Sequence, residues 1–249
     1  MMSRFKAAAI HLGISLFVVL IFLALMLGVW FPNGFFTLLG GSTLIYLISG
    51  VDVTLGPLLT LVVFKAGKKS LKFDLSVIAL FQIAALIYGA SVMFNSRPVF
   101  NVLEENIFKV TLASDFKDST QLKLAKNSAW RQLSITGPVL VAAVEPTNPK
   151  ERQAMVFAAA AGLDWNVFPA LYVDYDTQRD IALKNAKPLA DLSKLSSENA
   201  LVVRAFLKNQ NRSEESFVYL PIVSGYIAMT AVLDAKNADF VKIIPITPP

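Results

Sequence analysis

The stretch from Gly41 to Phe64, GSTLIYLISGVDVTLGPLLTLVVF, restricts what this chain can fold into more than any other. It is long and apolar enough for a membrane-spanning helix, for which about 20 apolar residues suffice. It nevertheless carries Asp52 near its middle and Pro57 shortly after. A charged Asp at this depth costs at least about 3 kcal/mol, so we expect it to face helices, water or a partner, or to be protonated. Pro57 frees a backbone carbonyl and predicts a kink just beyond Asp52.

Two further apolar runs, Ala7 to Trp30 and Leu75 to Phe94, provide neighbours for this helix. Hydrophobic residues make up 55% of the 249 residues, and this share is concentrated in the first 96. The fold class we expect is therefore a membrane protein, a bundle of three transmembrane α-helices followed by an α+β domain. The membrane domain covers residues 1–96 with spans at about 7–30, 41–64 and 75–94, and the soluble domain covers 97–249.

The positive charges are placed where a membrane protein needs them. The net charge is +5; Arg4 and Lys6 precede the first span, and the loop between the second and third spans carries Lys65, Lys68, Lys69 and Lys72. Residues 31–40 carry no charge. By the positive-inside rule the N-terminus and the lysine loop are cytoplasmic, and the domain after the third span lies on the other side. These cations predict contact with the lipid bilayer and not with nucleic acid.

The middle helix has a face of small residues that another helix can approach closely. Spacings such as Gly50 to Thr54 and Gly56 to Thr60 favour helix association in lipid, where dispersion contacts replace the hydrophobic effect. This face packs the protein's own helices, or it receives a partner, and both interpretations stay open. Gln82 of the third span lies at the same depth as Asp52, and we expect a hydrogen bond between them. The candidate partner-binding or helix-packing residues are Gly50, Asp52, Thr54, Gly56, Pro57 and Thr60.

Several kinds of catalytic site are excluded by composition. The chain has no cysteine, which removes thiol catalysis and thiolate metal sites. Its only histidine, His11, lies near the cytoplasmic end of the first span, where we expect it among the headgroups. Asp74 is the other acid near the spans, but it lies about 18 Å from Asp52 in depth, so the two cannot form a dyad. We expect no enzyme, no metal and no cofactor.

The soluble domain reads as α+β with an antiparallel sheet. Residues 99–103 and 107–112 predict a hairpin joined by a short turn, and residues 138–144 predict a further strand. Asn148-Pro149-Lys150-Glu151 and Ser196-Ser197-Glu198 are helix starts. The chain ends in the strand patterns 218–220, 227–233 and 240–246, the last limited to an edge by Pro245.

The sequence resembles the TfpX/TfpZ family of type IV pilin accessory proteins over nearly its full length. The residues that carry the resemblance are Asp52-Val-Thr-Leu-Gly-Pro-Leu-Leu-Thr-Leu-Val-Val-Phe-Lys65, the lysine loop from Gly67 to Leu75, Arg97-Pro98-Val-Phe100, Ala186-Lys-Pro-Leu-Ala190 and the ending from Leu233. Such long ordered matches are more specific than a short catalytic motif.

The resemblance implies an inner-membrane protein of Gram-negative bacteria that works with a major type IV pilin. The expected function is then a pilin-specific chaperone or assembly modulator with a periplasmic C-terminal domain. Its expected partners are the major pilin, the lipid bilayer and other pilus-assembly proteins. The alternative is a membrane-anchored scaffold or sensor subunit of an envelope machine.

Two roles for Asp52 remain open on this basis. It can receive the free N-terminal ammonium of the pilin, because opposite charges attract more strongly where the dielectric is low. It can also be a structural residue that is protonated or bonded to the backbone that Pro57 opens.

Overall fold

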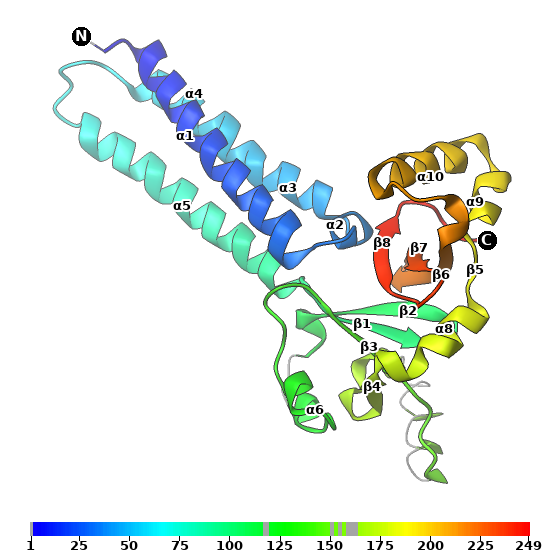
Figure 1. The fold of residues 1–249 in the computed structure, drawn as a ribbon. Helices are drawn as coiled ribbons and strands as arrows, with labels where there is room; N and C mark the ends of the chain where they lie inside the picture. Colours follow the sequence, from blue (N-terminus) through cyan, green and yellow to red (C-terminus); the bar gives the residue numbers. More distant parts are fainter. Residues whose placement is uncertain (1, 117–119, 150–151, 154–155, 158–163) are drawn as a thin grey trace. The chain divides into compact units, whose positions relative to one another are not determined.

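The computed structural model describes residues 2–116, 120–149, 152–153, 156–157 and 164–249. The chain forms two compact units, shown as a ribbon in Figure 1. The first contains Met1–Trp30 and Gly40–Ser96, and the second contains Phe31–Leu39 and Arg97–Pro249. The predicted helix after Asn148 lies largely outside the described residues.

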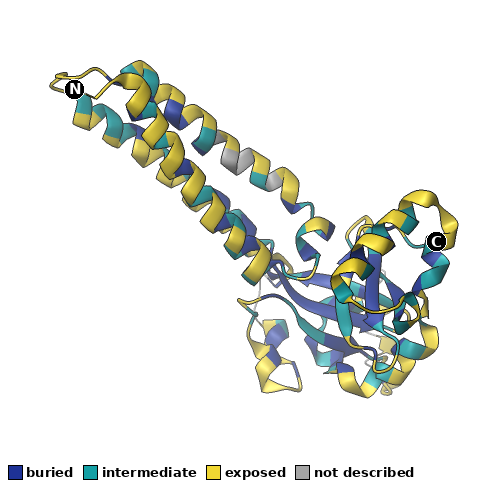
Figure 2. Cartoon of the chain, turned by 45° about the horizontal axis from the view of Figure 1, so that its top comes forward, coloured by how far each residue is buried: buried dark blue, intermediate teal, exposed yellow. Residues whose placement is uncertain are grey.

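The first unit consists of helices that lie side by side. α1 (Arg4–Leu25) begins at Ser3, whose side chain accepts a hydrogen bond from the Lys6 N–H, and it ends in a π-helical turn, Met26–Trp30. The middle segment is helical in three consecutive pieces, α3 (Gly41–Gly50), a π-helical turn (Val51–Leu55) and α4 (Gly56–Val63). α5 covers Leu71–Asn95. α4 contacts both α1 and α5, and the outward faces of these helices are exposed (Figure 2).

Two of the described helices are long and apolar enough to cross a membrane by length and composition alone. They are Arg4–Trp30 and Leu71–Asn95, and they match the predicted first and third spans. Within the middle segment, Asp52–Val63 is a shorter apolar helix. The middle span therefore stays a prediction.

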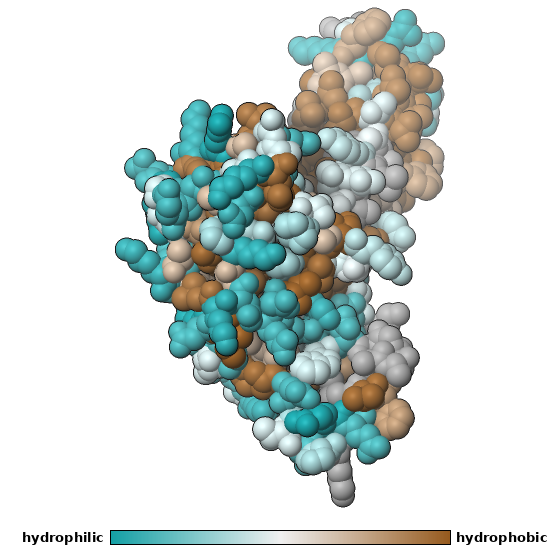
Figure 3. All heavy atoms as spheres, turned by 90° about the vertical axis from the view of Figure 1, so that its right-hand side faces the viewer, coloured by the Kyte–Doolittle hydropathy of each residue, from teal (hydrophilic) through white to brown (hydrophobic). Residues whose placement is uncertain are grey.

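The second unit is built on one sheet with short helices beside it. The visible face of this unit is largely hydrophilic, with scattered apolar side chains (Figure 3). Its strands are β1 (Pro98–Glu104), β2 (Ile107–Leu112), β3 (Val139–Ala143), β4 (Tyr172–Asp174), β5 (Lys187–Pro188), β6 (Phe217–Ser224), β7 (Ile227–Asp234) and β8 (Phe240–Ile244). Its helices are α2 (Phe35–Leu38), α6 (Thr120–Lys123), α8 (Arg179–Asn185), α9 (Leu189–Leu195) and α10 (Ser197–Gln210).

The sheet is mixed, and the prediction of an antiparallel sheet was wrong. Its order is β4-β3-β1-β2-β6-β7-β8, with β5 paired to β6. The predicted β1–β2 hairpin is confirmed and is antiparallel, as are β6–β7 and β7–β8. However, β1 pairs with β3 in parallel, and β2 pairs with β6 in parallel. These parallel pairs join strands that are far apart in the chain, and local sequence patterns do not reveal such pairings.

Two apolar clusters hold the sheet. One surrounds Phe100 and Tyr172, whose rings lie 5.1 Å apart at their centroids, and includes Trp130. The other lies between α9, α10 and strands β6 to β8, with Phe206 edge-on to Phe217 at 5.1 Å. α10 begins at Ser196, whose hydroxyl accepts a hydrogen bond from the Asn199 N–H, as the sequence predicts.

The segment Phe31–Leu39 groups with the second compact unit, although the sequence analysis counted it within residues 1–96. Phe35 and Leu38 are buried there, and the Phe35 ring stacks on Phe240 of β8 at 6.0 Å. The Ile243 N–H donates a hydrogen bond of 2.9 Å to the Asn33 carbonyl. The segment thus covers part of the free edge of β8, which would otherwise expose unpaired backbone groups.

We predict that Gly34→Ala destabilises the second unit more than Gly225→Ala does. Both glycines have positive φ, 94° and 57°, so each substitution costs about 1–2 kcal/mol of backbone strain. At Gly34 an added Cβ would also lie 2.5 Å from the Ile243 carbonyl oxygen, whereas nothing lies within 4 Å at Gly225. We expect this overlap to add about 1–3 kcal/mol. Thermal unfolding of the detergent-solubilised full chain, followed by tryptophan emission, measures the difference. Equal melting temperatures for the two variants would contradict the contact.

Candidate functional site

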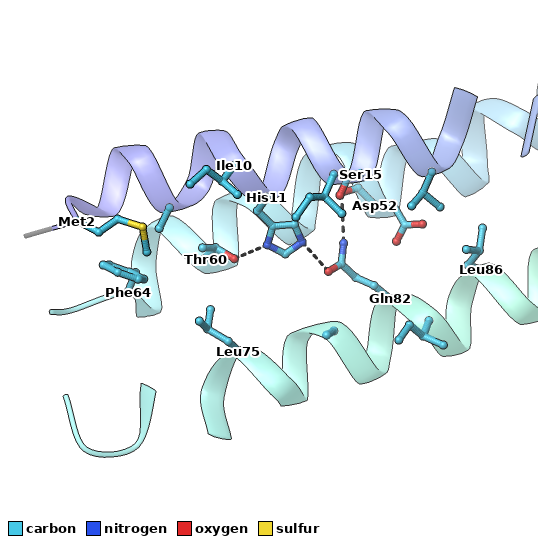
Figure 4. A pocket seen from close by; sticks show the side chains of 15 residues that line it. Met2, Ile10, His11, Ser15, Asp52, Thr60, Phe64, Leu75, Gln82 and Leu86 are labelled. Atoms are coloured by element: carbon cyan, nitrogen blue, oxygen red, sulfur yellow. Dashed lines mark hydrogen bonds between the residues drawn. The ribbon is translucent and has the colours of Figure 1, made fainter. Parts of the chain in front are cut away.

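The first unit contains an open groove of about 460 Å³ between α1 and α5, which we refer to as the α1–α5 groove (Figure 4). Its side chains at Ile10, Ile14 and Ile83 are 48%, 59% and 56% exposed, so the groove is accessible from outside. The lining residues are Met2, Ala7, Ile10, His11, Ile14, Ser15 and Val18 on the α1 side, Leu75, Ala79, Gln82, Ile83 and Leu86 on α5, and Asp52, Thr60 and Phe64 from the middle segment.

The walls of the groove follow from helix periodicity. Ala7, Ile10, Ile14 and Val18 recur at three- and four-residue steps and therefore share one face of α1. Leu75, Ala79, Ile83 and Leu86 do the same on α5. At about 1.5 Å per residue, each wall is about 17 Å long, or roughly three helical turns.

A chain of hydrogen bonds crosses the floor of the groove and joins the three helices. His11 Nδ1 lies 2.6 Å from Thr60 Oγ1, and His11 Nε2 lies 2.8 Å from Gln82 Oε1. Gln82 Nε2 donates to the Asp52 backbone carbonyl at 3.3 Å. A carbonyl can only accept, so this bond requires the Gln82 nitrogen on the Asp52 side and the oxygen Oε1 on the His11 side. Because Oε1 can only accept, His11 Nε2–H is the donor. In the neutral imidazole, Nδ1 then accepts from the Thr60 hydroxyl.

Asp52 is buried at 5% exposure, within the π-helical turn Val51–Leu55. Such turns are frequent at functional sites. Gln82 bonds to its main chain, so the predicted Gln82–Asp52 contact exists through the backbone carbonyl. Among the described residues, the carboxylate oxygen Oδ1 has no hydrogen-bond partner. Figure 4 shows the carboxylate on the side of the Gln82 amide away from His11.

The structure separates the six residues that the sequence singled out. Gly56, Pro57 and Thr60 are buried among the helices, as Asp52 is, whereas Gly50 and Thr54 are exposed. An added Cβ at Gly56 would lie 2.2 Å from Gln82 Nε2, so this glycine makes room for the amide. At Gly50 nothing lies within 4 Å. The Gly56–Thr60 spacing packs the protein's own helices, and the Gly50–Thr54 spacing does not.

Sequence reasoning missed His11 and Ser15 as groove residues. His11 bonds to both Thr60 and Gln82, and its expected depth near the headgroups stays a prediction. The signal that was available is its spacing, since His11 and Ser15 are four residues apart and lie next to Ile10 and Ile14 on one helix face.

In the second unit, the carboxylates mostly pair with cations. Lys109 lies 2.9 Å from Glu104 and 2.9 Å from Asp164. Burial raises the pKa of Glu104. Burial acts to lower the pKa of Lys109, but the neighbouring carboxylates of Asp164 and Glu104 outweigh it, so the pKa of Lys109 is raised. Asp176 pairs with Arg179 at 2.8 Å. The described part of the chain contains no group of three His, Cys, Asp or Glu residues placed to hold a metal ion.

The fold and the groove define a protein made of an apolar helical unit and a mixed-sheet unit. A family model, Fimbrial assembly protein FimB, matches residues 1–40. Two proteins of Dichelobacter nodosus, the fimbrial assembly proteins of serogroup E1 and serogroup I, are each 31% identical over 245 residues, which is 97% of this chain and 94% of each relative. The fimbrial assembly protein of serogroups C1 and C2 from the same organism is 35% identical over 112 residues, 44% of this chain and 86% of that relative.

This chain therefore belongs to the fimbrial assembly protein family. No solved structure matches it.

We predict that Gly56→Ala destabilises the helical unit and that Gly50→Ala does not. The new Cβ at position 56 displaces the Gln82 amide and breaks its bonds to His11 and the Asp52 carbonyl, at a cost of about 1–3 kcal/mol. At position 50 the same change meets no atom and raises helix propensity by up to about 1 kcal/mol. Loss of helical circular dichroism on heating, in detergent, measures both. A Gly56→Ala protein as stable as the Gly50→Ala protein would contradict the role of Gly56.

Proposed function

We propose that this protein is an inner-membrane accessory protein of type IV pilus biogenesis, a pilin-specific chaperone or assembly modulator that acts by binding the major pilin. Membership in the fimbrial assembly protein family supports a role in pilus biogenesis. The resemblance to the TfpX/TfpZ family supports the narrower assignment to pilin accessory proteins. The observation that carries pilin binding is the α1–α5 groove.

The groove fits one side of an apolar helix. Its walls are aliphatic over about three turns, and half-exposed isoleucines line it on both helices. A mature type IV pilin has a hydrophobic helix below a soluble head, and such a helix offers the matching surface. Within lipid, two helices associate through close packing and hydrogen bonds, because lipid chains are as apolar as the side chains. A preformed groove supplies that packing.

The proposal places three spans in the bilayer, with a cytoplasmic N-terminus and a periplasmic second unit. Its support is the two long apolar helices, the continuous helical structure of Gly41–Val63 and the concentration of lysines between residues 65 and 72. Lys68 pairs with Asp74 at 2.6 Å, so the acid at the start of α5 has a partner on the lysine side.

We propose a binding function without catalysis. Asp52 and Asp74 lie at different depths of the helical unit, about 18 Å apart, and His11 is held by Thr60 and Gln82. Other pilus-assembly proteins are further partners under this proposal.

Site-specific photo-cross-linking in piliated cells tests pilin binding. A photoreactive amino acid at Ile14 or Ile83 faces the groove, whereas Phe17 and Leu80 are 65% and 66% exposed but do not line it. We expect cross-links to the major pilin from Ile14 and Ile83 and a much weaker product from Phe17 and Leu80, because the pilin helix occupies the groove. Pilin antibody and mass spectrometry identify the product.

Equal cross-linking from all four positions would indicate a nonspecific encounter within the membrane. If none of them yields pilin, the proposed function is wrong.

Asp52→Ala separates recognition by Asp52 from a purely structural role. Removing a buried carboxylate that lacks a partner at Oδ1 should leave the melting temperature unchanged or raise it. If a donor of the pilin, such as its N-terminal ammonium, binds this oxygen, cross-linking from Ile14 should fall about tenfold, as expected for losing a hydrogen bond to a charged group. Thr54→Ala, at an exposed position on the same helical segment, is the control. A lower melting temperature with undiminished cross-linking would assign Asp52 a structural role.

A further inference from the structure

We propose that the turn between β6 and β7, with Tyr226 and Ile227, contacts the headgroup region of the lipid bilayer. This inference rests on the part of the proposed function that places the apolar helices in a membrane. Tyr226 is fully exposed and Ile227 is 44% exposed, at the tip of the hairpin in which β6 pairs with β7 from Phe217 to Asp234.

The topology of the second unit brings this tip to the edge of the sheet where the chain enters from α5. In the β1–β2 hairpin, Pro98 pairs with Leu112, so the end of β2 lies level with the start of β1. β6 runs parallel to β2, with Phe108 opposite Ile222. Ser224, at the end of β6, therefore points along the sheet toward the same edge as Pro98. Pro98 follows α5 by only two residues, so this edge is tethered close to the end of a predicted span.

A second covalent tether reaches the same place. Leu38 and Leu39 line one cavity of about 460 Å³ together with Ser224, Gly225 and Ile227. Leu39 is separated by one residue from Gly41, where the helical middle segment begins. The segment 31–39 joins two predicted spans, so it lies at the bilayer surface, and the residues that share its cavity lie there as well.

The chemistry of the tip suits the headgroup region. Tyrosine has an apolar ring and a polar hydroxyl, and it is enriched at membrane–water interfaces for that reason. The two acidic residues of the same cavity are partnered: Asp115 accepts from the Leu112 N–H at 2.8 Å, and Asp164 pairs with Lys109. Neither therefore presents a carboxylate without a partner to the lipid surface.

The absence of cysteine from the chain makes a direct test possible, since one introduced cysteine can be labelled alone. The full chain carrying Tyr226→Cys is labelled with a small environment-sensitive fluorophore. It is then reconstituted in vesicles of phosphatidylethanolamine and phosphatidylglycerol that contain a spin-labelled lipid, with the spin label in the headgroup. We expect quenching of at least about twofold relative to vesicles without the spin label, as for a residue held at the interface.

The control in the second unit is Ile181→Cys. Ile181 is 42% exposed and lines a cavity with Leu103 and Glu104, at the opposite end of β1 from Pro98. Along a strand this separation is about 20 Å. We expect no quenching there, because the two tethers hold the other edge at the lipid surface.

A third label, Leu20→Cys on the exposed face of α1, tests the membrane placement on its own with acyl-chain quenchers. If Leu20→Cys is quenched and Tyr226→Cys is not, the tip does not touch lipid and this inference is wrong, while the proposed function stands. If Leu20→Cys is not quenched either, the membrane part of the proposed function fails. Equal quenching at Ile181 and Tyr226 would also overturn the inference, because it would show no preference for the tip.

Discussion

The Gln82 side chain is the contact on which the helical unit depends. Its amide accepts from His11 of α1 and donates to the Asp52 carbonyl, and Thr60 of α4 completes the chain through His11. In apolar surroundings an unpaired amide is costly. The three helices are therefore held at one register by polar groups that satisfy one another, and Gly56 leaves the space that the amide needs.

The same network sets the surroundings of Asp52. Gln82 Oε1 and the Thr60 hydroxyl are engaged by His11, and Gln82 Nε2 donates to the Asp52 backbone carbonyl. The π-helical turn exposes the Asp52 carbonyl to Gln82, and the carboxylate Oδ1 is left without a partner among the described residues. Above this floor the groove walls are aliphatic and half exposed. A groove with one polar group at its floor can distinguish partners by a hydrogen bond as well as by shape.

The segment 31–39 connects the first and second of the three predicted spans and is also part of the sheet unit. Phe35 and Leu38 contribute to its core, and Asn33 accepts from β8. The sheet unit thus includes a segment from early in the chain. Residues Gly40–Ser96 of the helical unit separate this segment from the rest of the sheet unit.

The sequence by itself determined the apolar runs, the charge placement, the β1–β2 hairpin and the Ser196 helix start, because these depend on local periodicity and capping. It also indicated the small-residue face and the Gln82–Asp52 contact. Only the tertiary structure decided the parallel pairing of β1 with β3 and of β2 with β6, since loop lengths and strand patterns do not specify partners so far apart. It also decided that Gly56 packs inward while Gly50 is exposed, that His11 belongs to the network, and that Phe31–Leu39 joins the sheet unit. Each of these depends on which distant residues fill the same space, and packing of that kind is a property of the whole fold.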